Sequence, residues 1–361
     1  MSRKKIILIP TIDSIKSKNL IQWYGFENIQ FIVIASKFET IEKIRSSKLI
    51  YTIVGDGYIG LIKRYFFFIR AFLKYKISIV EIYPEGIHEF ILTALSRLFG
   101  KKIIIMARGN EHRYLKGQFS FSQNFFFNKT YELCHEIIYR EFYAESFIQK
   151  FNKKKYFISN SIKPKTFVEK PKDVFFNFLY INSFKTFRYP ELAIEAYILF
   201  CNKRKELNLK TFSNLFIVGV DQGDNEKSKL RSKYLASKYK DLNIHILPFE
   251  PDVNKYYNIS SVFLMPSSLT YLNNSLLESM SLGIVPIISN APNSDDIIDN
   301  FEDGFILDDN KYIWAEHMDI LYTKSDLFDT MSEKSKEKVD NKFSEKTFID
   351  EYKKIYAEIL K

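Results

Sequence analysis

Several features that often reveal a protein's function are scarce in this 361-residue sequence. Its two cysteines, Cys134 and Cys201, are too few for a disulfide framework or a four-thiolate zinc site. The five histidines form no i, i+4 pair and only His135 adjoins a cysteine, so we expect no metal and no other cofactor. Glycine (12) and proline (10) are also few, which excludes collagen-like, linker-type and wholly disordered chains.

No hydrophobic run is long enough to predict a membrane-spanning helix, because lysines and arginines interrupt the most apolar stretch, residues 61–76. The basic start, residues 1–5, precedes an apolar run at 6–9 that is too short for a secretory signal peptide. We therefore expect a cytoplasmic protein. Residues 61–76 suit a core helix whose cations reach solvent, or a helix lying on an anionic membrane.

Length and charge divide the chain into two halves. Single hydrophobic cores stop growing near about 250 to 300 residues, so 361 residues predict two domains. The net charge of +10 is uneven: residues 1–170 carry 29 Lys and Arg against 14 Asp and Glu, whereas residues 171–361 carry 24 against 29. We expect the basic half to attract an anionic partner, such as a pyrophosphate-linked lipid, a phosphorylated glycan or a membrane face.

Short β-branched runs alternate with helix-like segments in both halves, which predicts two α/β domains with Rossmann-like parallel sheets. The pattern dissolves over 153–172, around Pro164 and Pro171, so we predict domains at 1–170 and 171–342 and a final helix at 343–361. Ligands of such sheets bind beyond the carboxyl ends of the strands, so we expect a cleft between the two sheets. The predicted strands are 5–9, 30–34, 78–82, 102–106, 136–139, 177–181, 215–218, 243–247, 262–265 and 285–289. The predicted helices before the last one are 59–75, 87–98, 142–151, 190–202, 226–239, 274–282 and 295–300.

The most informative stretch is 266–307, where a buried strand ends in Pro266 and a polar loop leads to a helix at Asn273, Asn274 and Ser275. Free amides at a helix start, with the helix dipole behind them, suit an anion such as a diphosphate. Glu278 follows within the first turns. By spacing alone it is equally a capping-box carboxylate paired with Ser275.

This stretch resembles the donor-binding signature of glycosyltransferase family 4, a family of retaining enzymes with the two-domain GT-B architecture. The matching positions are Pro266-Ser267, Glu278-Ser279-Met280-Ser281, Gly283 and Pro286. Strand ends at 179–183, 215–219 and 243–249 follow in the family's order, so the resemblance covers about residues 175–310. It implies a GT-B fold whose final helix packs back on the first domain, and it agrees with the absence of a metal.

The resemblance also implies roles for donor-site residues. Glu278 would accept hydrogen bonds from the ribose, Asn274 and Ser275 would offer amides to the diphosphate, and Asn273 would face the sugar. Thr270 occupies the position of a family glutamate that reaches the transferred sugar, and a hydroxyl cannot supply that negative charge. Leu247 and Phe249 would border the nucleotide base.

The family also places an arginine and a lysine after the first strand of this domain to neutralise the departing diphosphate. These positions fall on Ser183 and Arg188, and Lys185 is a candidate to replace the missing charge. A solvated surface position is the alternative for both cations.

In the first domain, Arg108, Glu111, His112 and Arg113 directly follow the strand at 102–106. Such a polar loop suits a site. By resemblance, Arg108 would contact the donor, and Glu111 or His112 the acceptor hydroxyl, with Arg113 on the same side. The family's Gly-Gly pair is absent from 10–18, and Asn160-Ser161 replaces the usual Asn-Gly, so this domain is a divergent acceptor domain.

Together these patterns predict a retaining glycosyltransferase that uses a UDP- or GDP-sugar and a glycan or lipid-linked glycan acceptor in surface polysaccharide synthesis. The alternative is a noncatalytic nucleotide-sugar-binding subunit, since Thr270 and Ser183 replace charged family residues. Nucleic-acid binding is disfavoured because the basic half lacks a recognised aromatic-basic module. A Rossmann dehydrogenase is disfavoured because no Gly-x-Gly-x-x-Gly follows a strand.

Overall fold

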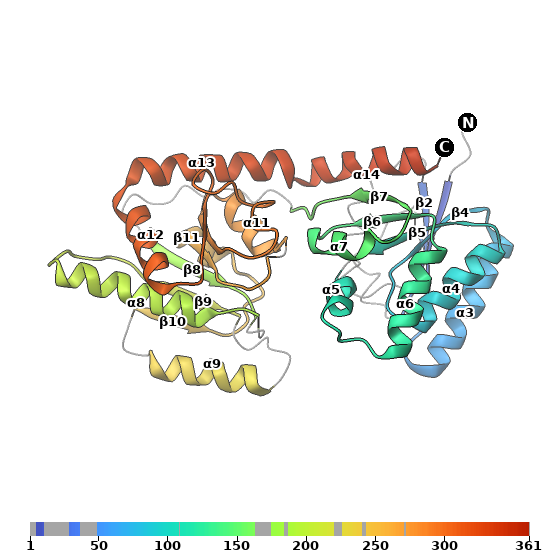
Figure 1. Cartoon of the computed structure of the whole chain (residues 1–361), viewed down its shortest axis with the longest axis horizontal. Helices are drawn as coiled ribbons and strands as arrows, with labels where there is room; N and C mark the ends of the chain where they lie inside the picture. The colour runs from blue at the N-terminus through green and yellow to red at the C-terminus, as the bar shows by residue number, and fades with distance from the viewer. Residues whose placement is uncertain are drawn as a thin grey trace. The chain divides into compact units, whose positions relative to one another are not determined.

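The computed structural model of this chain describes residues 5–10, 29–36, 49–107, 109–162, 175–183, 187–219, 226–239, 243–270 and 272–360. The chain forms two compact units (Figure 1). Unit 1 comprises Met1–Ser159 with Lys346–Lys361, and unit 2 comprises Asn160–Glu345.

The division falls after Ser159, rather than at residue 170 as the loss of pattern suggested. The side-chain amide of Asn160 already bonds within unit 2, donating to the Leu272 carbonyl at 2.9 Å and to Asn274 Oδ1 at 2.8 Å. Two residues later, Ile162 forms a parallel bridge with Ser344. These bonds place the start of unit 2 before the proline-containing stretch.

Unit 1 is built on a parallel sheet whose described strands run in the order β3-β2-β1-β4-β5-β6-β7. The strands are β1 (Lys5–Ile9), β2 (Ile29–Ala35), β3 (Leu49–Ile53), β4 (Ile77–Ile82), β5 (Lys102–Ala107), β6 (Glu136–Tyr139) and β7 (Lys154–Phe157). The helical elements are α3 (Gly57–Lys74), α4 (Ile87–Leu98), α5 (Asn110–Leu115), α6 (Phe121–Leu133), η2 (Phe142–Ala144), α7 (Glu145–Ile148) and α14 (Glu345–Ile359).

Both faces of this sheet are covered, which is why its central strands β1, β4 and β5 are mostly apolar. One face packs against Phe68 of α3, Leu92 of α4 and Phe127 of α6. The other face packs against α14 through Phe348 and Tyr356, with Tyr352 between them. The helix at the end of the sequence therefore belongs to the core of unit 1.

A buried carboxylate ties α14 to the sheet. Glu81 of β4 is fully buried and accepts hydrogen bonds from the hydroxyls of Tyr83 and Tyr356, each at 2.9 Å. Burial, with Glu81 beside it, raises the pKa of Tyr356. The Arg140 guanidinium lies 4.8 Å from the ring centre of Phe348, so a cation also faces this helix.

Unit 2 contains a second parallel sheet in the order β10-β9-β8-β11-β12-β13. Its strands are β8 (Asn177–Ile181), β9 (Leu215–Val218), β10 (Ile244–Leu247), β11 (Ser260–Met265), β12 (Val285–Ser289) and β13 (Phe305–Leu307). Its described helices are α8 (Pro190–Glu206), α9 (Glu226–Lys238), α10 (Asn254–Ile259), α11 (Asn274–Ser281), α12 (Lys311–Thr323) and α13 (Ser325–Lys342).

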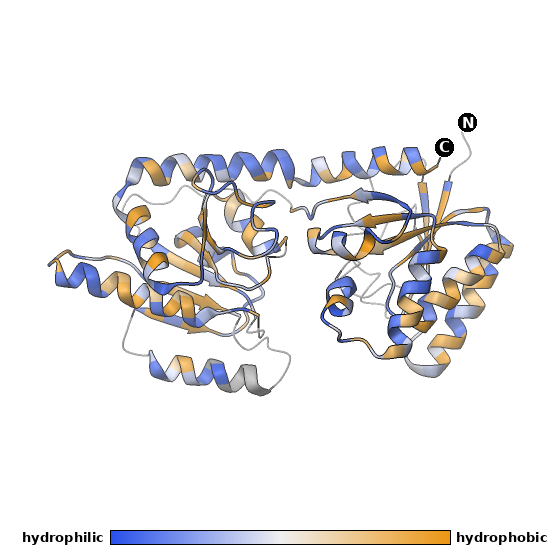
Figure 2. Cartoon of the chain, viewed as in Figure 1, coloured by the Kyte–Doolittle hydropathy of each residue, from blue (hydrophilic) through white to orange (hydrophobic). Residues whose placement is uncertain are grey.

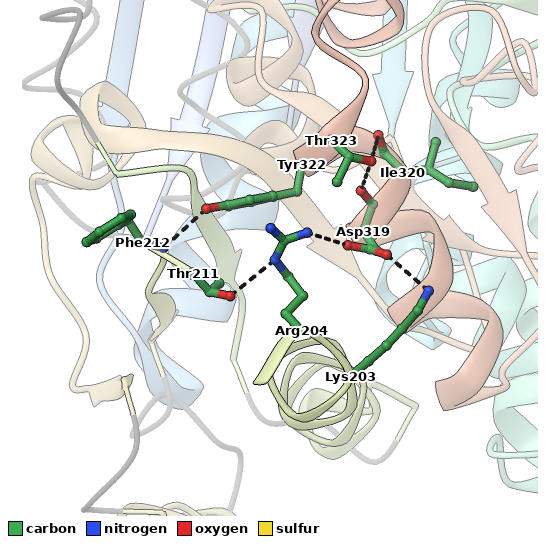
Figure 3. Close-up of polar contacts among 8 residues, drawn as sticks. All are labelled: Lys203, Arg204, Thr211, Phe212, Asp319, Ile320, Tyr322 and Thr323. Atoms are coloured by element: carbon green, nitrogen blue, oxygen red, sulfur yellow. Dashed lines mark hydrogen bonds and ion pairs between the residues drawn. The ribbon is translucent and has the colours of Figure 1, made fainter. Parts of the chain in front are cut away.

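Helices α8 and α12 are joined by a buried ion pair (Figure 3). Arg204 of α8 is 7% exposed, and its NH1 lies 2.9 Å from Asp319 Oδ1 on α12. The same guanidinium donates from Nε to Thr211 Oγ1 at 3.1 Å and stacks 4.3 Å from the ring centre of Tyr322. Lys203 pairs with the other oxygen of Asp319 at 3.0 Å, from a far more exposed position.

The structure differs from the predicted elements in three ways. Strands β3, β7 and β13 were not predicted, and β7 lies in the stretch taken for an interdomain connection. Helices α5, α6, α10, α12 and α13 were not predicted either. The helix expected over 295–300 is a series of turns. In these turns the Asp303 carboxylate accepts from the Asp299 amide at 2.9 Å, and the buried Lys338 bonds both carboxylates at 2.9 Å. These bonds take the place of a helical ladder.

Candidate functional site

The predicted donor residues of unit 2 follow the carboxyl ends of its strands. The strand order changes direction between β8 and β11, which is the point where open parallel sheets bind ligands. On the β9 side, Gly219 has φ +95°, and an added Cβ would lie 3.2 Å from the Asn182 carbonyl oxygen. A glycine here lets the ends of β8 and β9 approach closely.

The loops after β8 and β11 are pinned together at this switch point. The Ser268 amide donates to the Phe187 carbonyl at 3.0 Å, and the Tyr189 amide donates to the Pro266 carbonyl at 3.1 Å. Arg188 lies between them and forms an antiparallel bridge with Ser267. The Pro-Ser step of the sequence motif thus holds the segment that carries the predicted phosphate-binding arginine.

Arg188 and Ser183, two predicted site residues, are in contact. The Arg188 guanidinium donates to Ser183 Oγ at 2.8 Å and to the Ser183 carbonyl at 3.3 Å. Both side chains are partly exposed. The bond directs one edge of the guanidinium along the loop after β8. Lys185 lies outside the described residues.

Helix α11 begins as a capped helix. Asn273 is the N-cap, and its side-chain oxygen accepts from the Ser275 amide at 2.8 Å. Ser275 therefore lies inside the helix, and the capping box between Ser275 and Glu278 is not formed. The carboxylate of Glu278 is thus not needed to cap the start of the helix. Its side chain is half-buried.

Tyr257 of α10 lies beside Glu278 and was not expected at the site. It is fully buried and its hydroxyl donates to the Ser275 carbonyl at 3.2 Å. Burial, together with the charge of Glu278, raises the pKa of Tyr257, so this phenol stays protonated. Its position well before the motif in the sequence hid the contact, because only the folding of α10 against α11 brings the two together.

Thr270 was expected to face the sugar, and the structure places it differently. Its side chain is 2% exposed and its hydroxyl lies 2.7 Å from Ser294 Oγ. Ser294 in turn donates to the Ser289 carbonyl at 2.8 Å and accepts from the Ala291 amide at 3.2 Å. Thr270 therefore donates into this buried chain of bonds, which holds its loop against the turn after β12.

The remaining donor-side predictions lie at the end of β10 and the start of α11. Leu247 is the last residue of β10, and its carbonyl accepts from the Gly219 amide at 3.2 Å. Phe249 is 52% exposed, so its ring has a face available for contact. Asn274 is exposed and bonded to Asn160 through its side-chain oxygen.

In unit 1 the loop after β5 leads into α5 through Gly109, which has φ +109°. Arg108 lies outside the described residues. The Asn110 amide group donates to the Pro84 carbonyl at 2.8 Å, which joins the loops after β4 and β5. Arg113 is exposed, with its guanidinium 5.1 Å from the ring centre of Phe119.

Glu111 and His112 have different surroundings within this loop. The Glu111 carboxylate is fully buried: Oε2 accepts from the Gly109 amide at 2.9 Å and Oε1 from the Tyr131 hydroxyl at 2.5 Å. His112 is half-buried beside Tyr143. Burial, and to a lesser degree Lys116, lowers the pKa of His112, so its neutral ring predominates near pH 7. Glu111 therefore supports the loop, and His112 is the better placed of the two to meet a ligand.

Glu111→Ala should destabilise unit 1. The substitution leaves the buried Tyr131 hydroxyl and the Gly109 amide without their acceptor, at a cost of about 1 to 3 kcal/mol for each such group. Urea denaturation measures the loss, and the exposed Glu132→Ala on α6 is the control. Unchanged stability, combined with a raised KM for the acceptor, would contradict this structural role.

The described part of the chain contains no group of three His, Cys, Asp or Glu side chains able to hold a metal ion. Within the same residues, no helix is both long and apolar enough to cross a membrane.

Comparisons with known proteins agree with this geometry. Residues 161–338 match the family described as glycosyl transferases group 1. The chain is 27% identical over 150 residues to the capsular polysaccharide biosynthesis glycosyltransferase CapM of Staphylococcus aureus, a match that covers 41% of this chain and 39% of CapM. The chain thus spans about two fifths of the length of that curated relative.

Two solved structures share the whole fold. A glycosyltransferase from Rickettsia africae superposes with a TM-score of 0.76 at 14% identity, covering 100% of each chain. Anabaena HepE in complex with UDP-glucose superposes with a TM-score of 0.73 at 9% identity, covering 98% of this chain and 99% of that one. With the two parallel sheets, these likenesses confirm the predicted α/β class and the GT-B architecture.

Proposed function

Since residues 161–338 place this chain in the glycosyl transferases group 1 family, we propose that it transfers a sugar from a nucleoside diphosphate sugar to a hydroxyl of a glycan or lipid-linked glycan. The observation that carries the proposal is Arg188, held by Ser183 at the switch point of the unit 2 sheet. A cation at this position suits the diphosphate of a nucleotide sugar.

We assign the donor to unit 2. Arg188 and the amino-terminal end of α11, whose helix dipole favours an anion, bind the diphosphate, and Glu278 accepts hydrogen bonds from the ribose. Phe249 packs on the base. The similarity to HepE, solved with UDP-glucose, supports a uridine nucleotide as the first donor to test.

In the reaction we propose, the bond between the sugar C1 and the β-phosphate oxygen breaks, and the acceptor oxygen bonds to C1 on the same face. The acceptor proton passes to the leaving phosphate, so configuration is retained without a protein base. Glu111 is buried and already bonded, which fits a mechanism that does not use it as the base. Acceptor recognition falls to unit 1, with His112 and Arg113 as contacts and a surface polysaccharide precursor as the acceptor class.

Glu278→Gln should weaken nucleotide binding by about 10- to 100-fold, because it removes a charged acceptor of the ribose hydroxyls. The readout is the shift in melting temperature with UDP, GDP, ADP and CMP. The exposed Glu316→Gln on α12 is the matched control and should keep the full shift. If no nucleotide raises the melting temperature, or if Glu278→Gln retains the shift, the donor-site assignment is wrong.

A noncatalytic sugar-nucleotide-binding protein is the second candidate. Thr270, which stands where the resembled family has a glutamate, is bonded to Ser294 and buried. Such a protein would be stabilised by a nucleotide and would neither hydrolyse nor transfer any nucleotide sugar. Turnover assays with a panel of nucleotide sugars and acceptors therefore separate the two candidates.

A further inference from the structure

The outward face of α3 in unit 1 carries an apolar stripe that the proposed reaction does not use. Single exposed hydrophobic residues are ordinary on protein surfaces, whereas a contiguous set is a mark of an interaction site. On α3 the exposed fractions reach 82% at Tyr58 and 78% at Leu73. The stripe consists of Tyr58, Ile59, Ile62, Phe66, Ile69 and Leu73.

The spacing places these residues along one side of the helix. From Ile59 to Leu73 they recur at intervals of three and four residues, which is the period of a helix face. Gly60, Phe68 and Ala71 are buried on the opposite side, where Phe68 and Ala71 join the core that covers the sheet. Figure 2 shows the hydrophobic turns of α3 interrupted by hydrophilic ones.

Cations flank the stripe along one edge. Lys63, Arg70 and Lys74 are exposed and follow one another at intervals of seven and four residues, which is again one line along the helix. The helix contains no Asp or Glu from Gly57 to Lys74. Arg64 lies on the inner flank, where it donates to Ser36 Oγ at 2.6 Å.

The helix is held firmly in this orientation by α4 and the segment after it. The Tyr65 hydroxyl lies 2.9 Å from His88 Nδ1, and the rings of Phe72 and Phe99 stack with their centres 4.7 Å apart. Phe68 anchors the same side of the helix in the core. The stripe is therefore presented outward by a preformed support.

We propose that this face of α3 docks the protein on an anionic lipid bilayer. An amphipathic helix with aromatic and aliphatic residues on one face, bordered by cations, lies in the plane of the interface with its apolar side among the acyl chains. The charge of α3 favours a membrane over a second copy of this chain. Its three exposed cations, with no acidic residue on the helix, are complementary to anionic headgroups, whereas a second copy of the helix would bring only like charges. The eighteen residues of α3 span about 27 Å, enough to place the whole stripe on one surface.

This docking goes beyond the proposed transfer reaction and is tested without it. The full chain should sediment with vesicles of phosphatidylcholine mixed with phosphatidylglycerol, and much less with phosphatidylcholine alone. High salt should weaken the binding, because screening shortens the reach of the cations. Absence of sedimentation with the anionic vesicles, or equal binding to both kinds, overturns the proposal.

Two triple variants and a matched control locate the surface. Ile62→Ser with Phe66→Ser and Leu73→Ser should lower vesicle affinity at least about tenfold, and so should Lys63→Gln with Arg70→Gln and Lys74→Gln. The control is Leu207→Ser with Phe212→Ser and Tyr312→Ser, which removes three exposed apolar side chains from unit 2 and should bind as the wild type does.

Melting temperatures close to the wild-type value show that the variants are folded, as expected for exposed positions. Unchanged affinity in both triple variants contradicts docking through α3. So does a wild-type dimer in sedimentation velocity that the apolar triple variant dissociates, because the stripe would then be covered by a second copy.

Discussion

Arg188→Ala should lower kcat by about 100- to 1000-fold while the protein keeps its fold. Removing one positioned donor from a group on which charge develops typically has an effect of this size. Arg188 is partly exposed, so its loss leaves no large cavity. Steady-state kinetics with the donor that supports turnover measures the effect, and thermal melting checks the fold.

Two companion variants sharpen this test. Arg188→Lys keeps a charge but loses the forked geometry, and should recover only part of the rate. Ser183→Ala removes the acceptor 2.8 Å from the guanidinium and should reduce kcat less than Arg188→Ala does, because the cation remains. If kcat in Arg188→Ala stays close to the wild-type value, this arginine does not bind the departing diphosphate.

Asp319→Ala should reduce the free energy of unfolding of unit 2 by about 3 to 5 kcal/mol. The substitution leaves the guanidinium of Arg204, which is 7% exposed, without its carboxylate, and an uncompensated buried charge is costly. Trp314 is fully buried on the same helix as Asp319, so its fluorescence reports the unfolding of this unit in urea. A Trp23→Phe background makes Trp314 the single tryptophan of the chain.

Lys203→Ala is the matched control for this ion pair. Its ammonium also contacts Asp319, at 3.0 Å, but its side chain is 53% exposed, and exposed pairs contribute at most about 1 kcal/mol. A small effect of Lys203→Ala beside a large effect of Asp319→Ala would show that burial of the partner decides the cost. Similar losses in the two variants would contradict the importance of the buried guanidinium.

The central strands were predictable because each contains a run of buried apolar residues, at 103–107 in β5 and at 262–265 in β11. The strands that the sequence left unrecognised lie at or near sheet edges. Strand β7 reads Lys-Lys-Tyr-Phe, and β13 has only three residues. Such segments gain their strand geometry from a neighbour, which a local pattern does not show.

The positions of site residues were predictable where the backbone fixes them. They were less predictable where the orientation of a side chain depends on its tertiary contacts. The contact between Ser183 and Arg188 follows from a short loop after a strand. Glu111, in contrast, is a charged residue after a strand that turns inward to bond Gly109 and Tyr131. Burial of a carboxylate depends on partners distant in sequence, and so does the approach of Tyr257 to Glu278.

Because α14 belongs to unit 1 but follows unit 2 in the sequence, it affects the order in which the two units can finish folding during synthesis. The sheet face formed by Ile7, Ile79 and Met106 is made early, but its cover, residues 345–359, is made after all of unit 2. During translation unit 2 can fold while one apolar face of the unit 1 sheet is still exposed to solvent. A fragment ending at Ser159 would keep that face exposed. Unit 1 therefore begins to be synthesised first but can complete its core only after unit 2 has been made.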